Sequence, residues 1–274
     1  MKMGNRRIRV LAGLGFSLAF LAVVCIWGSL STETARVTDF SRVNIPPCLR
    51  YPFGTDWLGR DMLARTLKGL SMSIWIGILS AAVSAAVALV LGITSATMGK
   101  AADSVISFLI DLIMGVPHIL LLILISVALG KGLRGVIIGV SLTLWPSLAR
   151  LIRAEVIQLR ESPYIQIARR LGKGRWYIAG KHMLPHLIPQ FIVGLVLLFP
   201  HAILHESSVT FLGFGLSTEQ PAIGIVLSEA MKYLVTGKWW LALFPGLLLV
   251  FTVVMFYVMG ESLRKLLDPN SVHQ

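Results

Sequence analysis

The sequence has 274 residues, of which 55% are apolar and only 14% are charged. Because a soluble domain ordinarily carries about a quarter charged residues, this composition excludes an ordinary soluble protein and indicates a chain that crosses a membrane repeatedly. The net charge of +12 would favour nucleic acid only on a basic face of a soluble fold. Here the basic residues cluster at the ends of apolar runs, so we expect no nucleic-acid partner.

Six apolar segments are long enough to cross a bilayer, which takes about 20 predominantly apolar residues. They are residues 10–30, 72–98, 104–129, 134–152, 187–215 and 239–262. The first resembles a secretory signal, but an apolar core of this length suits a retained span better than a cleaved one. The stretch from Leu195 to Leu216 contains Pro200 and a glycine-rich end, which predicts an interrupted helix. The sequence thus predicts an all-α integral membrane protein with about six transmembrane helices.

The placement of lysine and arginine predicts the orientation, because cytoplasmic loops carry an excess of both. With six spans the two termini share one side, and a cytoplasmic location for them gives that side the larger share of basic residues. The dense basic loop at 150–182 is the strongest support, whereas Lys131 and Arg134 on the other side argue against it. We expect a multi-pass protein whose N and C termini are cytoplasmic.

The basic loop itself has the pattern of two short helices. Ser162 followed by Pro163 predicts a helix start, with the serine as N-cap and the proline in the first turn. Gly172 and Gly174 would end this helix, since glycine tolerates the left-handed geometry of a helix terminus. A second helical piece then runs to Pro185. On these grounds alone, a solvated basic loop is an equally good interpretation.

The same loop resembles the "EAA" signature of ABC importer permeases, which reads Glu-Ala-Ala, three residues, Gly, nine residues, then Ile-x-Leu-Pro. Four positions match at that spacing: Ala168, Gly172, Leu184 and Pro185. Three depart from it in the manner of the peptide/nickel branch: Gln166, Ile167 and His182. The resemblance implies an ATPase-coupling loop made by Tyr164, Gln166, Ala168, Arg169, Gly172, Leu184 and Pro185. Gln166 in place of glutamate puts one ATPase contact in question.

Two further stretches are similar to the same branch. Residues 51–61, YPFGTDWLGRD, resemble its "HPFGTDxLGRD" segment, and residues 211–215, FLGFG, resemble its "SFLGLG". Three motifs in the right order, together with six spans, identify the chain as similar to permease subunits of the dipeptide/oligopeptide/nickel branch of ABC importers, of the "C" type.

The resemblance implies a type I ABC importer permease fold in a bacterial inner membrane, surrounded by lipid. It divides the chain into an N-terminal transmembrane helix (1–31), an extracytoplasmic segment (32–69), a transmembrane domain of five helices with the coupling loop at 153–185 (70–265), and a cytoplasmic tail (266–274). The implied partners are a homologous permease subunit, two cytoplasmic ATPase subunits and an extracytoplasmic substrate-binding protein. ATP and Mg would be bound by the ATPases; this chain has no G-x-x-x-x-G-K-[ST] stretch, and we expect a permease without a cofactor or catalysis of its own.

The most unusual residues lie in LLFPHAILHESSVTFLGFG, residues 197–215. His201 and His205 are four residues apart and would share one helix face, and Glu206 follows at once. A zinc-protease motif needs glutamate directly after the first histidine, which disfavours a membrane metalloenzyme; simple packing across to neighbouring helices is the alternative interpretation.

The histidine pair resembles nickel-type "C" subunits, while Glu206 is the acid of the peptide type. We expect a substrate path that includes His201, His205 and Glu206, with the histidines as transient metal ligands. The expected substrate is nickel or another transition metal, free or chelated. A di- or oligopeptide is the alternative.

Overall fold

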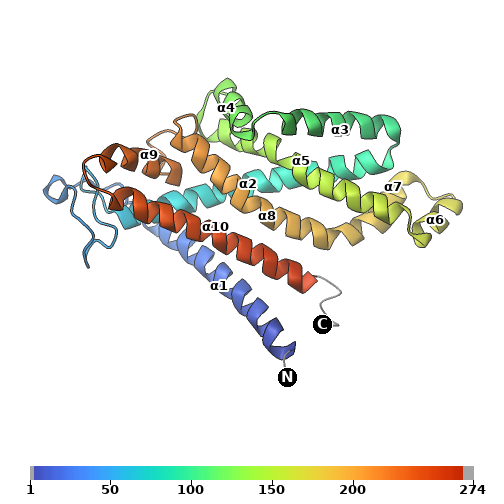
Figure 1. Cartoon of the computed structure of the whole chain (residues 1–274), viewed down its shortest axis with the longest axis horizontal. Helices are drawn as coiled ribbons and strands as arrows, with labels where there is room; N and C mark the ends of the chain where they lie inside the picture. Colours follow the sequence, from blue (N-terminus) through green and yellow to red (C-terminus); the bar gives the residue numbers. More distant parts are fainter. Residues whose placement is uncertain (1–2, 268–274) are drawn as a thin grey trace.

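The computed structural model describes residues 3–267, which form helices and connecting loops and, within that range, no β-strand. Five helices are long and apolar enough to cross a membrane (Figure 1). They are α1 (Met3–Leu30), α2 (Met62–Thr97), α5 (Gly132–Arg160), α8 (Leu184–Phe211) and α10 (Trp240–Leu267). The shorter elements are the 3-10 helix η1 (Phe40–Arg42), α3 (Lys100–Gly115), α4 (His118–Ala128), α6 (Pro163–Arg170), α7 (Arg175–Ile178), the π-helix η2 (Ala179–Met183) and α9 (Ile223–Leu234).

The α2 helix occupies the centre of the bundle and packs against α1, α5 and α8. Its buried face carries small residues at every fourth position, which lets neighbouring backbones approach closely. A Cβ at Gly77 would lie 2.6 Å from Ile203 Cγ1 of α8, and one at Gly92 would lie 2.9 Å from the carbonyl oxygen of Ala149 of α5. Close helix contact at these points therefore depends on glycine.

The predicted segments and the observed helices differ most in two places. The span expected at 104–129 is a bent pair, because α3 and α4 meet at 96° across the break before His118; counted as one span, the pair gives the sixth. The α2 helix begins at Met62, and the side chain of Asp61 caps it by accepting a hydrogen bond from Leu63 N–H. The last eight residues of the extracytoplasmic segment predicted at 32–69 are therefore helical. The predicted tail, 266–274, lies outside the described residues after Leu267.

The predicted interruption of the helix near Pro200 is wrong. The α8 helix contains both Pro189 and Pro200 and continues to Phe211. It ends in a Schellman motif: Gly213 has φ +84, its N–H donates to Thr210 O, and Phe214 N–H donates to Val209 O. This hydrogen-bond pair is the usual way for a left-handed glycine to satisfy the last carbonyls of a helix.

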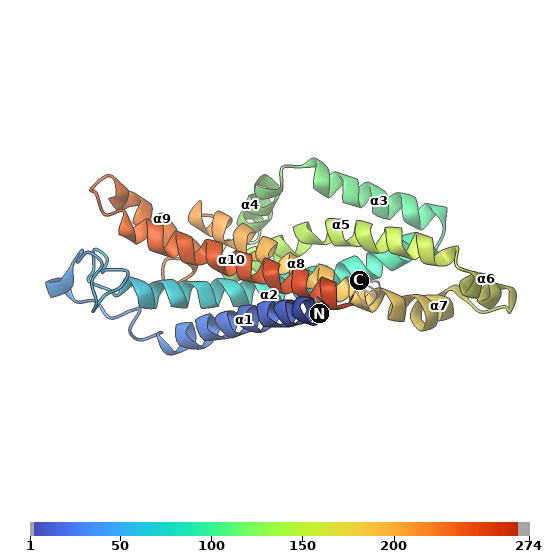
Figure 2. The same ribbon diagram turned by 60° about the horizontal axis from the view of Figure 1, so that its bottom comes forward.

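The bundle has two distinct ends (Figures 1 and 2). The α6 end carries α6 and α7, and the start of α1 and the end of α10 point towards it. The α9 end carries α9 and the segment between α1 and α2. Sites at the two ends are described in turn below.

Candidate translocation path and coupling loop

The motif at residues 51–61 builds a buried ion network at the α9 end. Asp56, whose side chain is 0% exposed, accepts hydrogen bonds from the backbone N–H groups of Leu58 and Arg60 at 2.8 and 2.9 Å. Its carboxylate also pairs with Arg60 Nε at 2.7 Å and Arg65 Nη1 at 2.6 Å. Arg65 then reaches Glu229 of α9 through Nη2 at 2.7 Å. The network joins the start of α2 to α9.

An aromatic stack supports the same junction. The Trp57 ring stacks on Tyr233, with centroids 4.6 Å apart and planes at 10°, and the guanidinium groups of Arg60 and Arg65 lie 5.2 and 5.5 Å from the Trp57 ring centre. Gly59 closes the turn with φ +73, and a Cβ there would lie 1.9 Å from Asp39 O. The motif is therefore a folded cap in which the tryptophan, the charges and the glycine all have structural contacts.

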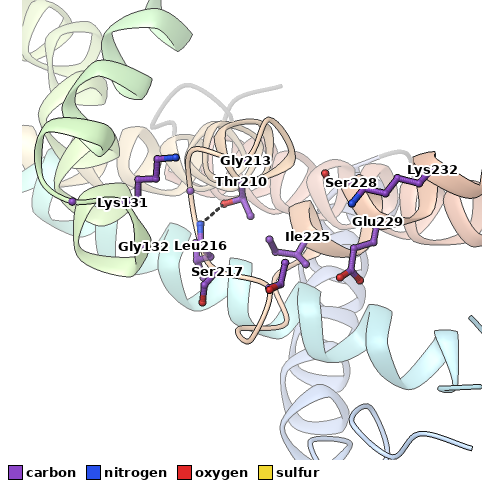
Figure 3. Close-up of a pocket in the computed structure, with 13 residues that line it drawn as sticks. Lys131, Gly132, Thr210, Gly213, Leu216, Ser217, Ile225, Ser228, Glu229 and Lys232 are labelled. Carbon is purple, nitrogen blue, oxygen red and sulfur yellow. Dashed lines mark hydrogen bonds between the residues drawn. The ribbon is translucent and has the colours of Figure 1, made fainter. Parts of the chain in front are cut away.

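A pocket with a cavity volume of about 520 Å³ lies beside this network (Figure 3). Lys131 borders it on one side, and Glu229 and Lys232 border it on the other. The FLGFG tail forms part of its wall: Phe214 O accepts from Ser126 Oγ at 2.8 Å, and Gly215 O accepts from Gly132 N–H at 3.0 Å. These bonds join the segment after α8 to the end of α4 and the start of α5.

Lys131 was missed as a candidate site residue. It has φ +57 and lies between Gly130 and Gly132, which have φ +90 and +79. A lysine rarely adopts this backbone region, and such strain concentrates at functional sites. The sequence signal was the Gly-Lys-Gly turn itself.

The two histidines of α8 are placed differently from one another. His201 is exposed and His205 is half-buried. The His205 ring packs on that of His118, the first residue of α4, with centroids 3.9 Å apart and planes at 31°. Both ring nitrogens of His118 are buried and have no hydrogen-bond partner within the described chain. The structure therefore brings a third histidine to the predicted pair.

This cluster does not form a metal site of the usual kind. Among residues 3–267, no group of three or more His, Cys, Asp or Glu side chains has an arrangement that could hold a metal ion. The three histidines are thus close neighbours without the convergent geometry that a coordination shell requires.

Glu206 lies on a different face of α8 from His201. Its side chain is fully buried and accepts hydrogen bonds from Thr210 Oγ1 at 2.9 Å and from Ser207 Oγ at 3.3 Å. Ser73 of α2 lies close to it, and the Ser73 hydroxyl accepts from Ile223 N–H, at the start of α9, at 3.3 Å. Glu206 is therefore buried in the interior of the chain where α8 meets α2 and α9.

Two ion pairs join α3 to α5. Arg153 donates to both oxygens of Asp103, at 2.6 and 2.7 Å. The second pair, between Arg150 Nη2 and Asp111 Oδ1 at 2.8 Å, leaves the arginine 53% and the aspartate 70% exposed. Exposed charges within membrane-crossing helices face water or another protein rather than lipid. This face of α3 and α5 is therefore unsuited to contact with acyl chains.

The predicted helix at the start of the coupling loop is confirmed as α6, with a different capping interaction. The Ser162 hydroxyl donates to Leu159 O and makes no N-cap bond, while the Ser162 carbonyl accepts from Ile165 and Gln166 N–H. Gly172, at φ +75, ends the helix in a second Schellman motif. Its N–H donates to Arg169 O, and Lys173 N–H donates to Ala168 O. Gly174 has φ −65 and begins α7 instead.

The residues predicted to form the coupling loop divide into a buried and an exposed set. Ala168 packs inwards with Ile165, whereas Tyr164, Gln166 and Arg169 are exposed. Ile167 and Leu171 are also exposed, by 57% and 73%, and apolar side chains on so short a helix favour a protein partner. Leu184 and Pro185 belong to the first turn of α8, and helix continues from Arg175 to Phe211.

The fold is a bundle of membrane-crossing helices, with a short exposed amphipathic helix at one end and a polar pocket at the other, an arrangement expected of a transport subunit. The sequence profile of the binding-protein-dependent transport system inner membrane component family matches residues 88–272. The chain belongs to this family, and it is an ABC importer permease rather than an enzyme. It is a membrane protein and works with ATPase and substrate-binding partners.

Three relatives of the chain are named as peptide or dipeptide permeases. The chain is 32% identical to the dipeptide transport system permease protein DppC of Bacillus subtilis (strain 168), over 94% of this chain and 81% of that one. It is 34% identical to a putative peptide transport system permease of Brucella abortus biovar 1 (strain 9-941), over 97% and 89%. It is 30% identical to the probable D,D-dipeptide transport system permease protein DdpC of Escherichia coli (strain K12), over 88% and 81%. These relatives favour the peptide alternative over the nickel expectation.

Solved structures support the fold. A chain of the MetNI methionine ABC transporter, in inward-facing conformations, matches with a TM-score of 0.62 at 18% identity, over 76% of this chain and 98% of that one. An amino acid ABC transporter determined with histidines matches with a TM-score of 0.54 at 20% identity, over 77% and 95%. The predicted type I ABC importer permease fold is confirmed.

Proposed function

We propose that this chain is one permease subunit of an ABC importer for di- or oligopeptides. The observation that carries the proposal is the similarity, along nearly the whole chain, to relatives named as dipeptide or peptide permeases. The nickel expectation rested on His201 and His205, and His205 packs on His118 instead of pairing with His201 around a common centre. A peptide path needs no such centre.

The mechanism follows from the two ends of the bundle. The α6 end faces the bacterial cytoplasm, where α6 docks on one of two ATPase subunits that hold ATP and Mg. The α9 end faces the substrate-binding protein, and a homologous permease completes the path. Closure of the ATPases moves α6, and the helices respond as rigid bodies that open the path alternately to each side.

The exposed polar side chains of the bundle support an assignment of the face that lines this path. His201 on α8 and the Asp111–Arg150 pair across α3 and α5 are exposed, and a water-filled path shared with the second permease is the environment that suits them. Glu206 contributes indirectly, because it is buried where α8 packs against α2 and α9.

The coupling role of α6 is tested with a matched pair of glycine variants. Gly172→Val places a β-branched residue at φ +75, where even an ordinary L residue costs about 1–2 kcal/mol. Gly174→Val introduces no backbone strain, because Gly174 has φ −65 and no atom lies within 4 Å of the added Cβ. In cells with the full importer, Gly172→Val is expected to abolish ATP-dependent uptake of a labelled dipeptide, with normal membrane insertion, while Gly174→Val transports. Undiminished uptake by Gly172→Val and by a deletion of 163–174 would refute the coupling role.

The substrate is tested separately with the double variant His201→Ala, His205→Ala. We expect nickel accumulation in cells to be the same with and without the variant. A fall in nickel accumulation with unchanged dipeptide uptake would show that the importer carries metal.

A further inference from the structure

A second pocket, with a cavity volume of about 300 Å³, lies at the α6 end. It is bordered by the end of α2, the turn before α3, the end of α5, and the α6–α7 segment, which lie together at this end (Figure 1). None of its eight lining residues is acidic, and four are cationic: Arg160, Arg169, Lys173 and Arg175. Its size is at the lower end of the range of about 300–1,000 Å³ for ligand pockets.

Two of the four cationic side chains are held in place by carbonyl oxygens rather than by carboxylates. Arg160 Nη1 donates to Ala96 O, and Arg175 Nη1 donates to Met98 O at 3.3 Å. Arg160 Nε is buried and has no hydrogen-bond partner in the described chain. Within the described chain, none of the four lining cations forms an ion pair with an acid. The pocket therefore has preoriented donors and no counter-charge of its own.

Such an arrangement selects an anion with several acceptor oxygens. Like charges gathered in a concave site repel one another and focus a positive potential, which an anion relieves. The planar guanidinium group matches phosphate through paired N–H···O bonds. A single carboxylate would leave donors from separate elements unmatched, whereas phosphate presents acceptor oxygens in several directions.

We propose that this pocket binds a phosphate group, presented by the headgroup of an anionic phospholipid. The pocket lies where membrane-crossing helices end, and basic pockets at that level on the cytoplasmic side bind lipid headgroups. The assignment of the phosphate to a lipid depends on the proposed function, which places the α6 end in the cytoplasm. The inference that the pocket binds phosphate depends only on its lining residues. A phosphate held by α2, α5 and the coupling loop together would stabilise the position from which α6 contacts its ATPase.

Binding is tested on the complete importer in nanodiscs of phosphatidylcholine alone, or of phosphatidylcholine and phosphatidylglycerol in equal parts. Lys173→Gln is the informative variant, because Lys173 Nζ lies 5.0 Å from the Tyr177 ring centre and anchors no backbone group in the described chain. The control is Lys265→Gln, which changes the same charge on α10, outside the pocket. We expect about tenfold weaker retention of phosphatidylglycerol with Lys173→Gln, as for loss of one charge-assisted hydrogen bond, and no change with Lys265→Gln.

Function gives a second readout. ATP hydrolysis stimulated by the loaded binding protein is expected to be higher in discs with phosphatidylglycerol, and Lys173→Gln is expected to remove this difference. Inorganic phosphate added to phosphatidylcholine discs separates the sources: if it reproduces the effect, the phosphate site stands and its occupant is the free ion. Equal retention of phosphatidylglycerol by Lys173→Gln and Lys265→Gln, without a phosphate effect, would overturn the proposal, as would an ATPase carboxylate seated in the pocket of the assembled importer.

Discussion

The ion network around Asp56 gives the sharpest prediction of stability. Asp56→Ala removes a fully buried carboxylate that holds two arginines and two backbone N–H groups. Arg60 and Arg65, whose side chains are only 16% and 5% exposed, are then left with Glu229 as the one carboxylate between them, at 3.8 and 2.7 Å. The loss of one member of a buried ion pair leaves an uncompensated buried charge, and it costs about 3–5 kcal/mol.

The corresponding shift of the melting temperature is about 6–20 °C, since 1 kcal/mol corresponds to roughly 2–4 °C for 150–250 residues. Asp56→Asn separates the contribution of the negative charge from that of the hydrogen bonds that the side chain accepts from backbone N–H groups. The amide oxygen still accepts from Leu58 and Arg60 N–H, while the charge is lost, so we expect a smaller shift than for alanine. The measurement is the thermal loss of the monodisperse peak of the purified permease complex in size-exclusion chromatography.

The control for this series is Glu261→Gln on α10. Glu261 pairs with Arg264 and Lys265 at 3.7 and 3.3 Å, and all three side chains are exposed. Exposed pairs of this kind contribute about 0–1 kcal/mol, so its melting temperature should stay within a few degrees of the parent. If Asp56→Ala melts no earlier than Glu261→Gln, the network does not hold α2 to α9 and the reasoning is wrong.

Three further predictions concern the interior of the bundle. Gly92→Ala is expected to destabilise the protein by about 1–3 kcal/mol through overpacking against Ala149 O. Gly15→Ala has no atom within 4 Å of the added Cβ and should be neutral or stabilising, since glycine in a helix costs about 0.5–1 kcal/mol relative to alanine. Equal melting temperatures of the two variants would contradict this prediction. Glu206→Leu should cost about 1–3 kcal/mol because its hydroxyl donors lose their acceptor, and Glu206→Gln should cost less. His118→Ala should remove about 0.5–1.5 kcal/mol of ring packing, measured by the same chromatographic melting, and no change would show that the ring contact contributes nothing.

Features set by local chemistry could be predicted from the sequence. The positions of the five long helices follow from apolar runs of membrane-crossing length. The α6 helix follows from Ser162-Pro163 at its start and Gly172 at its end, because both signals act within a few residues. The small-residue spacing of α2, which includes Gly77 and Gly92, was also readable from the sequence, as a repeat of four.

Features set by distant residues could not be predicted. The second span was predicted from residue 72, whereas α2 begins at Met62. Arg65 lies in this first part of the helix, and its partner Glu229 lies 164 positions further along the chain. His205 was assigned to a pair with His201, but its ring contact is with His118 on another helix. Pro200 signalled a break locally, yet Pro200, Ala202 and Ile203 are all buried, and Ile203 packs at Gly77 of α2. Packing on both sides of the proline keeps α8 in one piece.

The uninterrupted α8 is what makes long-range coupling physically reasonable. Helix runs from Arg175 to Phe211, 37 residues, or about 55 Å at 1.5 Å per residue. One end follows directly on the coupling loop through the π-helix Ala179–Met183, a kind of wide turn often found at functional sites. The other end packs against α2 and α9, where Glu206 is buried. In the proposed mechanism a displacement of α6 would be absorbed at a break near Pro200, whereas a continuous helix would carry it to the pocket at the α9 end.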